Sequence, residues 1–126
     1  MKIYREKADR MLVKEYSGRI YNISADLPQQ EIEMAKAYIR DAVITFCQNN
    51  PGQSFAVRDL FGGENRDWRG TPLQAIYEYH AAAGAANPRD NAGKDVGKLM
   101  KIVLSEEDGY YIQSQSGKTK QYRKVN

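Results

Sequence analysis

Apolar residues in the last third of the chain recur at the spacing of one helix face. Positions 96, 99, 100, 103 and 104 are all apolar, and this i, i+3, i+4, i+7, i+8 pattern predicts an amphipathic helix over residues 91–104. Its N-terminal cap is expected to be Asp90 or Asn91. A second stripe on this helix carries the lysines Lys94, Lys98 and Lys101. The predicted helix therefore buries one side and presents a basic side to solvent.

A β-hairpin is predicted directly after this helix. Residues 110–115 and 118–125 have strand-forming composition, and Ser116-Gly117 between them is typical of a two-residue turn. With that turn Tyr111 would lie opposite Tyr122, and both side chains are expected to anchor the hairpin to the core. The cations of this segment are Lys118, Lys120, Arg123 and Lys124, and residues 109–126 contain no acid. The hairpin is therefore expected to be basic.

The middle of the chain predicts two helices with a short strand and a helical turn between them. The first helix is expected to begin near Leu27, with Asp26 as N-cap, and to end near residues 49–52. A short strand is predicted over residues 53–57 and a helical turn over residues 58–61. After a loop, Thr71 is expected to cap the next helix, with Pro72 at its first position and Gly84 after its end.

The first 25 residues leave two interpretations open. The favoured one is a second hairpin, with strands over residues 11–16 and 19–23 and a turn at Ser17-Gly18. The alternative is a helix over residues 4–13 followed by one strand. The chain is accordingly divided into an N-terminal β extension, residues 1–26, and a single further domain, residues 27–126.

Composition counts against an enzyme and against a membrane protein. The 126 residues include one cysteine, Cys47, and one histidine, His80, so no disulfide or cysteine metal cage is expected within the chain. Cys47 is expected to be a small buried residue and His80 a packed one, and the sequence predicts no cofactor. The cluster Tyr77, Tyr79 and His80 is the one candidate for catalysis. An N-terminus without an apolar signal segment, and no apolar run of membrane-spanning length, predict a cytoplasmic protein.

Charge is unevenly distributed along the chain. Residues 26–86 contain five Lys or Arg and eight Asp or Glu, whereas residues 87–126 contain eight Lys or Arg and five Asp or Glu. Attraction to a polyanion depends on local charge within about one Debye length, roughly 8 to 10 Å. The basic C-terminal part therefore indicates a nucleic-acid partner more strongly than the net charge of +3 does.

The predicted order of elements over residues 28–126 is helix, short strand, helix, helix and hairpin, and it resembles a winged-helix domain, a variant of the helix-turn-helix. In that family the third helix enters the major groove, while the hairpin, called the wing, lies along the backbone or in the minor groove. The resemblance implies an α+β fold with a winged-helix-like three-helix core and a C-terminal β-hairpin. The helix over residues 91–104 would be the recognition helix and residues 110–125 the wing. Whether residues 58–61 or the Pro72 helix is the family's second helix stays open, and with it which helix reads DNA.

The leading hypothesis is a small double-stranded-DNA-binding protein, such as a transcriptional regulator or a phage-related or bacterial factor. The lysines of the helix and hairpin would contact phosphates, and base reading would fall to residues near the helix N-terminus. The alternatives are a solvated helix face and edge-strand protection by the hairpin lysines. The predicted nucleic-acid-binding residues are Arg89, Asn91, Lys94, Lys98, Lys101, Lys118, Lys120, Arg123 and Lys124.

The second hypothesis is a protein–protein interaction module of the same fold, such as an adaptor or an inhibitor of a nucleic-acid enzyme. Its contact surface would include Trp68 with the neighbouring Arg66 and Arg69, because aromatic residues and arginine are enriched at interface centres. The competing interpretation of Trp68 is a structural residue that covers the core. A homodimer through the N-terminal strands is also compatible with the sequence.

Overall fold

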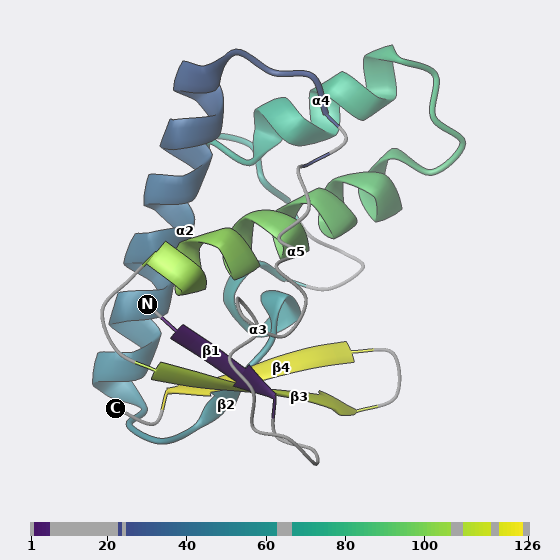
Figure 1. Cartoon of the computed structure of the whole chain (residues 1–126). Helices are drawn as coiled ribbons and strands as arrows, with labels where there is room; N and C mark the ends of the chain where they lie inside the picture. Colours follow the sequence, from purple (N-terminus) through teal and green to yellow (C-terminus); the bar gives the residue numbers. More distant parts are fainter. Residues whose placement is uncertain are drawn as a thin grey trace.

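Four helices and four short strands make up the described part of the chain (Figure 1). The helices are α2 (Gln29–Asn49), α3 (Val57–Phe61), α4 (Gln74–Ala82) and α5 (Pro88–Glu106), and the strands are β1 (Lys2–Arg5), β2 (Ser54–Phe55), β3 (Tyr110–Ser116) and β4 (Thr119–Lys124). This computed structural model describes residues 2–5, 23, 25–62, 67–106, 110–116 and 119–124, and the side chains of all of these except 2–5, 110, 114–116 and 119. The fold class is α+β, as predicted.

The strands form one sheet in the order β1-β3-β4-β2, with the helices on one side of it (Figure 1). β3 pairs antiparallel with β4, β4 pairs antiparallel with β2, and β1 pairs parallel with β3. α5 packs against α2, α3, α4 and β1. It is therefore the element around which the other helices are arranged.

Phe55 joins the helical layer to the sheet. Its side chain is fully buried, and its ring centroid lies 5.4 Å from that of Phe46 on α2. On the sheet it lies 6.2 Å from Tyr111 and 6.2 Å from Tyr122. Aromatic rings at these separations contribute packing energy beyond their buried area. The expectation that Tyr111 and Tyr122 anchor the hairpin to the core is confirmed.

The register of the hairpin differs from the prediction by two residues. Ser116 pairs with Thr119 and Gln113 with Tyr122, so Tyr111 lies opposite Lys124. Ser116 is therefore a strand residue and not part of the predicted turn. Because the side chains of a strand alternate with period two, a shift of two residues leaves Tyr111 and Tyr122 on the face that contacts the helices.

α5 begins earlier than its periodicity indicates. The Asn87 side-chain Oδ1 accepts a hydrogen bond from the Asp90 backbone N–H at 3.2 Å, and Pro88 occupies the first helical position, where no N–H is needed. The predicted caps Asp90 and Asn91 therefore lie inside the helix. The predicted helix itself is confirmed and extends to Glu106.

The starts of α2 and α4 also differ from the predictions. Pro28 rather than Asp26 precedes the first residue of α2. Thr71 accepts the Leu73 N–H through Oγ1 at 3.2 Å, but it forms a turn before α4 rather than its cap, because α4 begins at Gln74. The end of α2 at Asn49 and the helical turn of α3 agree with the predictions. None of the helices in the described ranges has the length and apolar character needed to cross a membrane.

The N-terminal segment contributes β1 to the sheet. Tyr4 and Arg5 are strand residues that pair with Ile112 and Gln113, so the alternative helix over residues 4–13 is wrong at its start. The predicted hairpin around Ser17-Gly18 lies outside the described residues.

Candidate nucleic-acid interface

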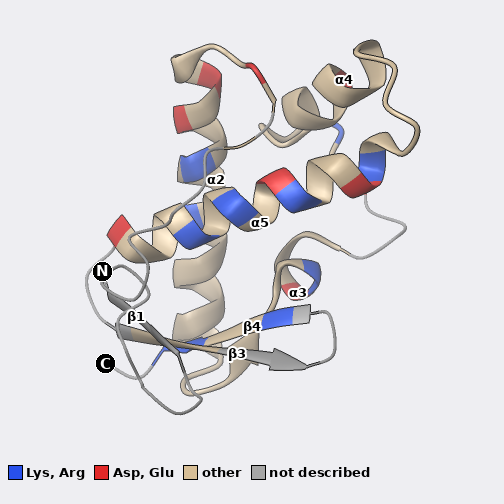
Figure 2. Ribbon diagram, turned by 45° about the vertical axis from the view of Figure 1, so that its right-hand side comes forward, with Lys and Arg blue, Asp and Glu red and all other residues tan. Residues whose placement is uncertain are grey.

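The solvent side of α5 carries the lysines predicted to contact nucleic acid (Figure 2). The Lys94 side chain is 69% exposed and forms an ion pair with Asp90, one turn earlier, at 3.2 Å. Lys98 is half-buried and has no ion-pair partner among the residues that the structure describes. Lys101 is half-buried and takes part in an interaction of its own. These three positions follow one another at i, i+4 and i+7, so their charges lie along one side of the helix.

The acids of α5 act mainly within the fold. Asp95 is fully buried. Glu106 lies against α2, where its Oε1 is 2.9 Å from the Lys36 Nζ and 3.8 Å from the Arg40 Nη2. Between Asp90 and Glu106 the solvent side of α5 therefore presents cations and no acid.

The cations of the hairpin do not gather at one place. Lys120 is exposed near the end of β4 that follows the turn, whereas Lys124 lies at the opposite end of the strand. Four residues along a strand span about 13 Å. Arg123 is half-buried, takes part in another interaction, and by strand alternation points to the opposite face from Lys124. Lys118 lies outside the described residues. Lys120 is therefore the described hairpin cation best placed to act as part of a wing.

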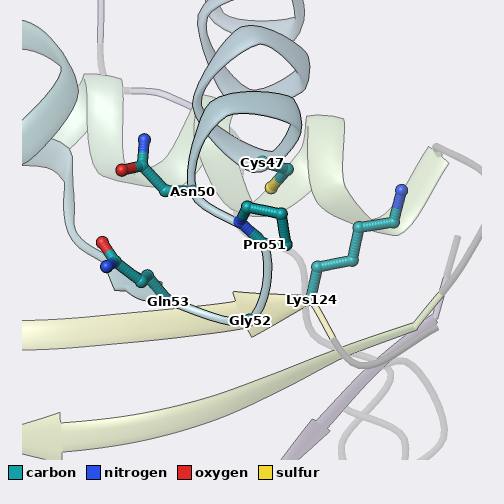
Figure 3. Close-up of a pocket in the computed structure, with 6 residues that line it drawn as sticks. All are labelled: Cys47, Asn50, Pro51, Gly52, Gln53 and Lys124. Carbon is teal, nitrogen blue, oxygen red and sulfur yellow. The ribbon is translucent and has the colours of Figure 1, made fainter.

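Lys124 lies beside a small pocket at the C-terminal end of α2 (Figure 3). The pocket has a volume of about 220 Å³ and is lined by Cys47, Asn50, Pro51, Gly52, Gln53 and Lys124. A cation near the C-terminus of a helix is favoured by the helix dipole. This position gives Lys124 a structural explanation that needs no nucleic acid.

Cys47 is half-buried in the same pocket. Burial raises the pKa of its thiol, and the opposing effects of a hydrogen bond from Tyr111 and the charge of Lys124 are smaller. A thiol with a raised pKa stays protonated near neutral pH and is a poor nucleophile. Cys47 is therefore less buried than the sequence analysis expected.

Trp68 is part of the core, so the alternative in which it is exposed to a partner is wrong. Its side chain is 5% exposed, and its indole Nε1 donates a hydrogen bond to the Phe61 carbonyl at 2.9 Å. A buried indole needs such a partner for its N–H. Trp68 therefore fixes the chain between α3 and α4, as the structural interpretation expected.

Arg69, the next residue, points into solvent from a closed turn. The Thr71 backbone N–H and the Thr71 hydroxyl both donate hydrogen bonds to the Trp68 carbonyl, at 3.0 Å and 2.7 Å. Gly70 in this turn has φ +81°, a backbone conformation that glycine adopts without steric cost. The Arg69 side chain is 81% exposed. Arg66, the other arginine predicted here, lies outside the described residues.

The Arg69 guanidinium forms a two-pronged pair with the Asp67 carboxylate. Its Nη2 lies 2.7 Å from Asp67 Oδ2, and its Nε lies 3.0 Å from Oδ1. The Arg69 backbone N–H also donates to Oδ1, at 3.1 Å. The carboxylate therefore fixes the arginine at both its backbone and its side chain.

This pair lowers the pKa of the Asp67 carboxyl from 3.8 to about 2, mainly through the hydrogen bonds from the Arg69 side chain and then through the Arg69 backbone N–H. Because the pKa is depressed, the pair persists above this value and is lost as pH falls through about 2.

We expect a carbon-detected NMR titration of the Asp67 carboxyl to show this midpoint. Arg69→Ala should move the midpoint back toward 3.8, while Arg40→Ala on α2 should not move it. A midpoint unchanged by Arg69→Ala would contradict the pairing.

The turn lies within electrostatic reach of the first turn of α5. The positive charge of Arg89, the second residue of α5, also lowers the pKa of Asp67. Arg89 is exposed and has an interaction of its own, and Asn91 is half-buried. Residues predicted for two separate sites, the basic helix and the Trp68 loop, thus lie within range of each other's charge.

A buried polar group that the sequence analysis did not pair lies behind α5. The His80 Nε2 on α4 is 2.8 Å from the Asp95 Oδ2, which also accepts the Ala25 backbone N–H at 3.1 Å. The expectation that His80 is packed is confirmed, since it is 6% exposed. The sequence did contain a signal for this pair. Asp95 lies on the apolar stripe of α5, and His80 lies on the apolar stripe of α4. Neither is open to a substrate in the described structure, where no group of three or more His, Cys, Asp or Glu side chains could hold a metal ion.

Comparison with known proteins finds no relative of this chain. It matches no protein-family model, no curated protein and no solved structure. Its candidate function therefore depends on the geometry of the interface itself.

Proposed function

We propose that this protein binds double-stranded DNA through the solvent side of α5, with the β3–β4 hairpin as an adjoining contact. The observation that carries the proposal is the line of Lys94, Lys98 and Lys101 on a helix whose acids, apart from Asp90, are turned inward or held by α2. Lysine side chains along one side of a helix can contact successive backbone phosphates at the edge of a DNA groove. Their charge acts without sequence preference and positions the protein on the duplex.

The arrangement of the hairpin supports a winged-helix type of binding. The chain has the element order α2, β2, α3, α4, α5 and then the hairpin. The hairpin is held to the helices through β2, which pairs with β4, and through the buried rings of Tyr111 and Tyr122. A hairpin anchored in this way directly after a basic helix can extend the contact along the DNA backbone. The exposed Lys120 is its described candidate for a phosphate contact.

Fluorescence anisotropy with a labelled duplex of mixed sequence tests this proposal. We expect wild-type affinity in the micromolar range or tighter, falling steeply between about 50 and 200 mM salt as counterions are released. The variant Lys98→Ala, Lys120→Ala should bind more weakly. The slope of log affinity against log salt should fall by roughly one for each phosphate that the variant no longer neutralises.

A charge-matched variant separates local contacts from net charge. Gln30→Glu, Thr45→Glu places the same charge change on exposed positions of α2 and should leave the salt slope unchanged. A wild-type affinity that does not fall with salt would overturn the proposal. So would equal weakening by the two variants, since that would mean that only total charge matters.

A protein–protein interaction module is the second candidate. The observation that favours it is on α2, where the side chains of Met34 and Tyr38 are 52% and 38% exposed and lie one turn apart. Exposed apolar side chains close together on a surface are a feature of interaction sites. Absence of duplex binding at low salt would make this candidate the better one.

A further inference from the structure

The Arg69 guanidinium has a free edge that is held in a fixed orientation. Arginine has five side-chain N–H donors, and the Asp67 carboxylate takes those of Nε and one of Nη2. The second N–H of Nη2 and one N–H of Nη1 form the terminal edge of the plane. This edge is a fork of parallel donors, the arrangement that matches a pair of acceptors in one plane.

The backbone under this fork is also fixed. The turn is closed by two hydrogen bonds to the Trp68 carbonyl, and Trp68 itself is anchored by its indole bond to Phe61. An exposed arginine usually loses rotamer freedom when it binds, and this loss opposes binding. Here the Asp67 contact has already restricted the side chain, so less freedom is lost when the fork binds.

The paired carboxylate decides which acceptors suit the fork. Together Arg69 and Asp67 carry no net charge, so the pair attracts a phosphate less than a lone arginine does, and the carboxylate repels phosphate oxygens nearby. A guanine edge presents two neutral acceptors, O6 and N7, in the major groove. The geometry of the fork suits this ligand as well as it suits a phosphate, and the neutral acceptors are repelled less by the carboxylate.

We propose that Arg69 reads guanine through O6 and N7 in the major groove, with Asp67 as its positioning residue, while the α5 lysines hold the phosphates. The inference rests on the proposed duplex binding. It assigns base reading to the turn before α4 in addition to the first turn of α5. Arg89 in that first turn of α5 is near enough for its charge to lower the pKa of Asp67. The sequence analysis assigned α5 to DNA and the loop with Arg69 to a protein partner. The present inference assigns both segments to DNA.

The test compares two short duplexes, one with G·C pairs and one of A·T pairs alone, at one salt concentration. We expect the wild type to prefer the G·C duplex by about tenfold, the scale of one bidentate base contact. Arg69→Lys should lose that preference and keep its affinity for the A·T duplex, because lysine keeps the charge but lacks the fork. Arg69→Ala should also lose the preference, and its affinity for the A·T duplex should fall only by the effect of one lost charge. Replacing guanine with 7-deazaguanine, which lacks the N7 acceptor, should remove the preference of the wild type and leave Arg69→Ala unaffected.

Two further variants show what Arg69 does. Asp67→Asn keeps the arginine but removes the charged partner that orients it, so the preference should shrink while affinity for the A·T duplex rises. Arg40→Ala, another arginine with a carboxylate neighbour, should change neither. Equal loss of affinity for both duplexes in Arg69→Ala would make Arg69 a phosphate contact, and no loss would make it a solvated ion pair; both would overturn the inference. Failure of the wild type to bind either duplex would instead overturn the proposed function.

Discussion

Asp95→Ala is expected to lower the free energy of unfolding by about 2 to 5 kcal/mol, because it leaves buried polar groups without their hydrogen-bond partner at a cost of about 1 to 3 kcal/mol each. The Asp95 carboxylate is fully buried and accepts hydrogen bonds from both the His80 ring and the Ala25 backbone N–H. Its removal leaves both groups without this acceptor, away from water, and a buried donor without an acceptor is costly. Chemical denaturation monitored by circular dichroism measures the loss.

Asp90 provides the matched control for this experiment. It is on the same helix, but it is exposed, and its ion-pair partner in the described part of the chain is the exposed Lys94. Asp90→Ala should therefore change stability by no more than about 1 kcal/mol. If Asp95→Ala does not fold, Asp95→Asn keeps the shape and one acceptor and should show an intermediate loss. A loss below about 1 kcal/mol in both Asp95 variants would mean that the buried pair contributes little.

Phe55→Ala is expected to cost about 3 to 5 kcal/mol, the range for removing a large aromatic side chain from a core. The ring contacts Phe46 on α2 and the hairpin tyrosines at once. Its loss should therefore loosen the hairpin from the helices as well as destabilise the chain. Denaturation gives the free energy, and amide hydrogen exchange in β3 and β4 should show that protection decreases first in the hairpin.

The neighbouring Ser54 distinguishes packing from strand pairing. Ser54 is exposed and lies in the same two-residue strand, so Ser54→Ala should stay within about 0.5 kcal/mol of wild type. Phe55→Leu, which keeps much of the apolar volume, should fall between the two. A cost below about 2 kcal/mol for Phe55→Ala would mean that the core collapses around the missing ring.

The helices could be predicted from the sequence because their buried apolar residues recur with the spacing of one helix face. The apolar positions predicted for α5, Val96, Leu99, Met100, Val103 and Leu104, are all buried in the structure. Helix starts were less predictable because several residues near each start can act as a cap. Asn87 rather than Asp90 bonds the first turn of α5, and Pro88 directly after Asn87 is the sequence signal that favours this earlier start.

Features that depend on a distant partner could not be predicted. A hairpin register shifted by two residues keeps every side chain on its face, so the pattern of Tyr111 and Tyr122 fits either register. β1 acquires its strand conformation from pairing with β3, at the other end of the chain. A short strand with a remote partner has no local signal beyond its composition.

The candidate site was predicted in part. The lysine stripe follows from helix periodicity, and Lys94, Lys98 and Lys101 lie along the solvent side of α5 as expected. The hairpin cations were expected together, but strand alternation and length separate Lys120 from Lys124 and Arg123. The pairing of Asp67 with Arg69 across the buried Trp68 was missed, because it depends on the closed turn and not on composition.

The parallel pairing of β1 with β3 affects the order in which this chain can fold during synthesis. Lys2 pairs with Tyr110 and Arg5 with Gln113, so β1 is synthesised long before the strand with which it pairs. α2, α3, α4 and α5 can associate before that point, since their contacts involve residues already made. Closing so long a loop slows folding more than it lowers stability. Completion of the sheet is therefore the late step, because β1 and β2 are joined through β3 and β4.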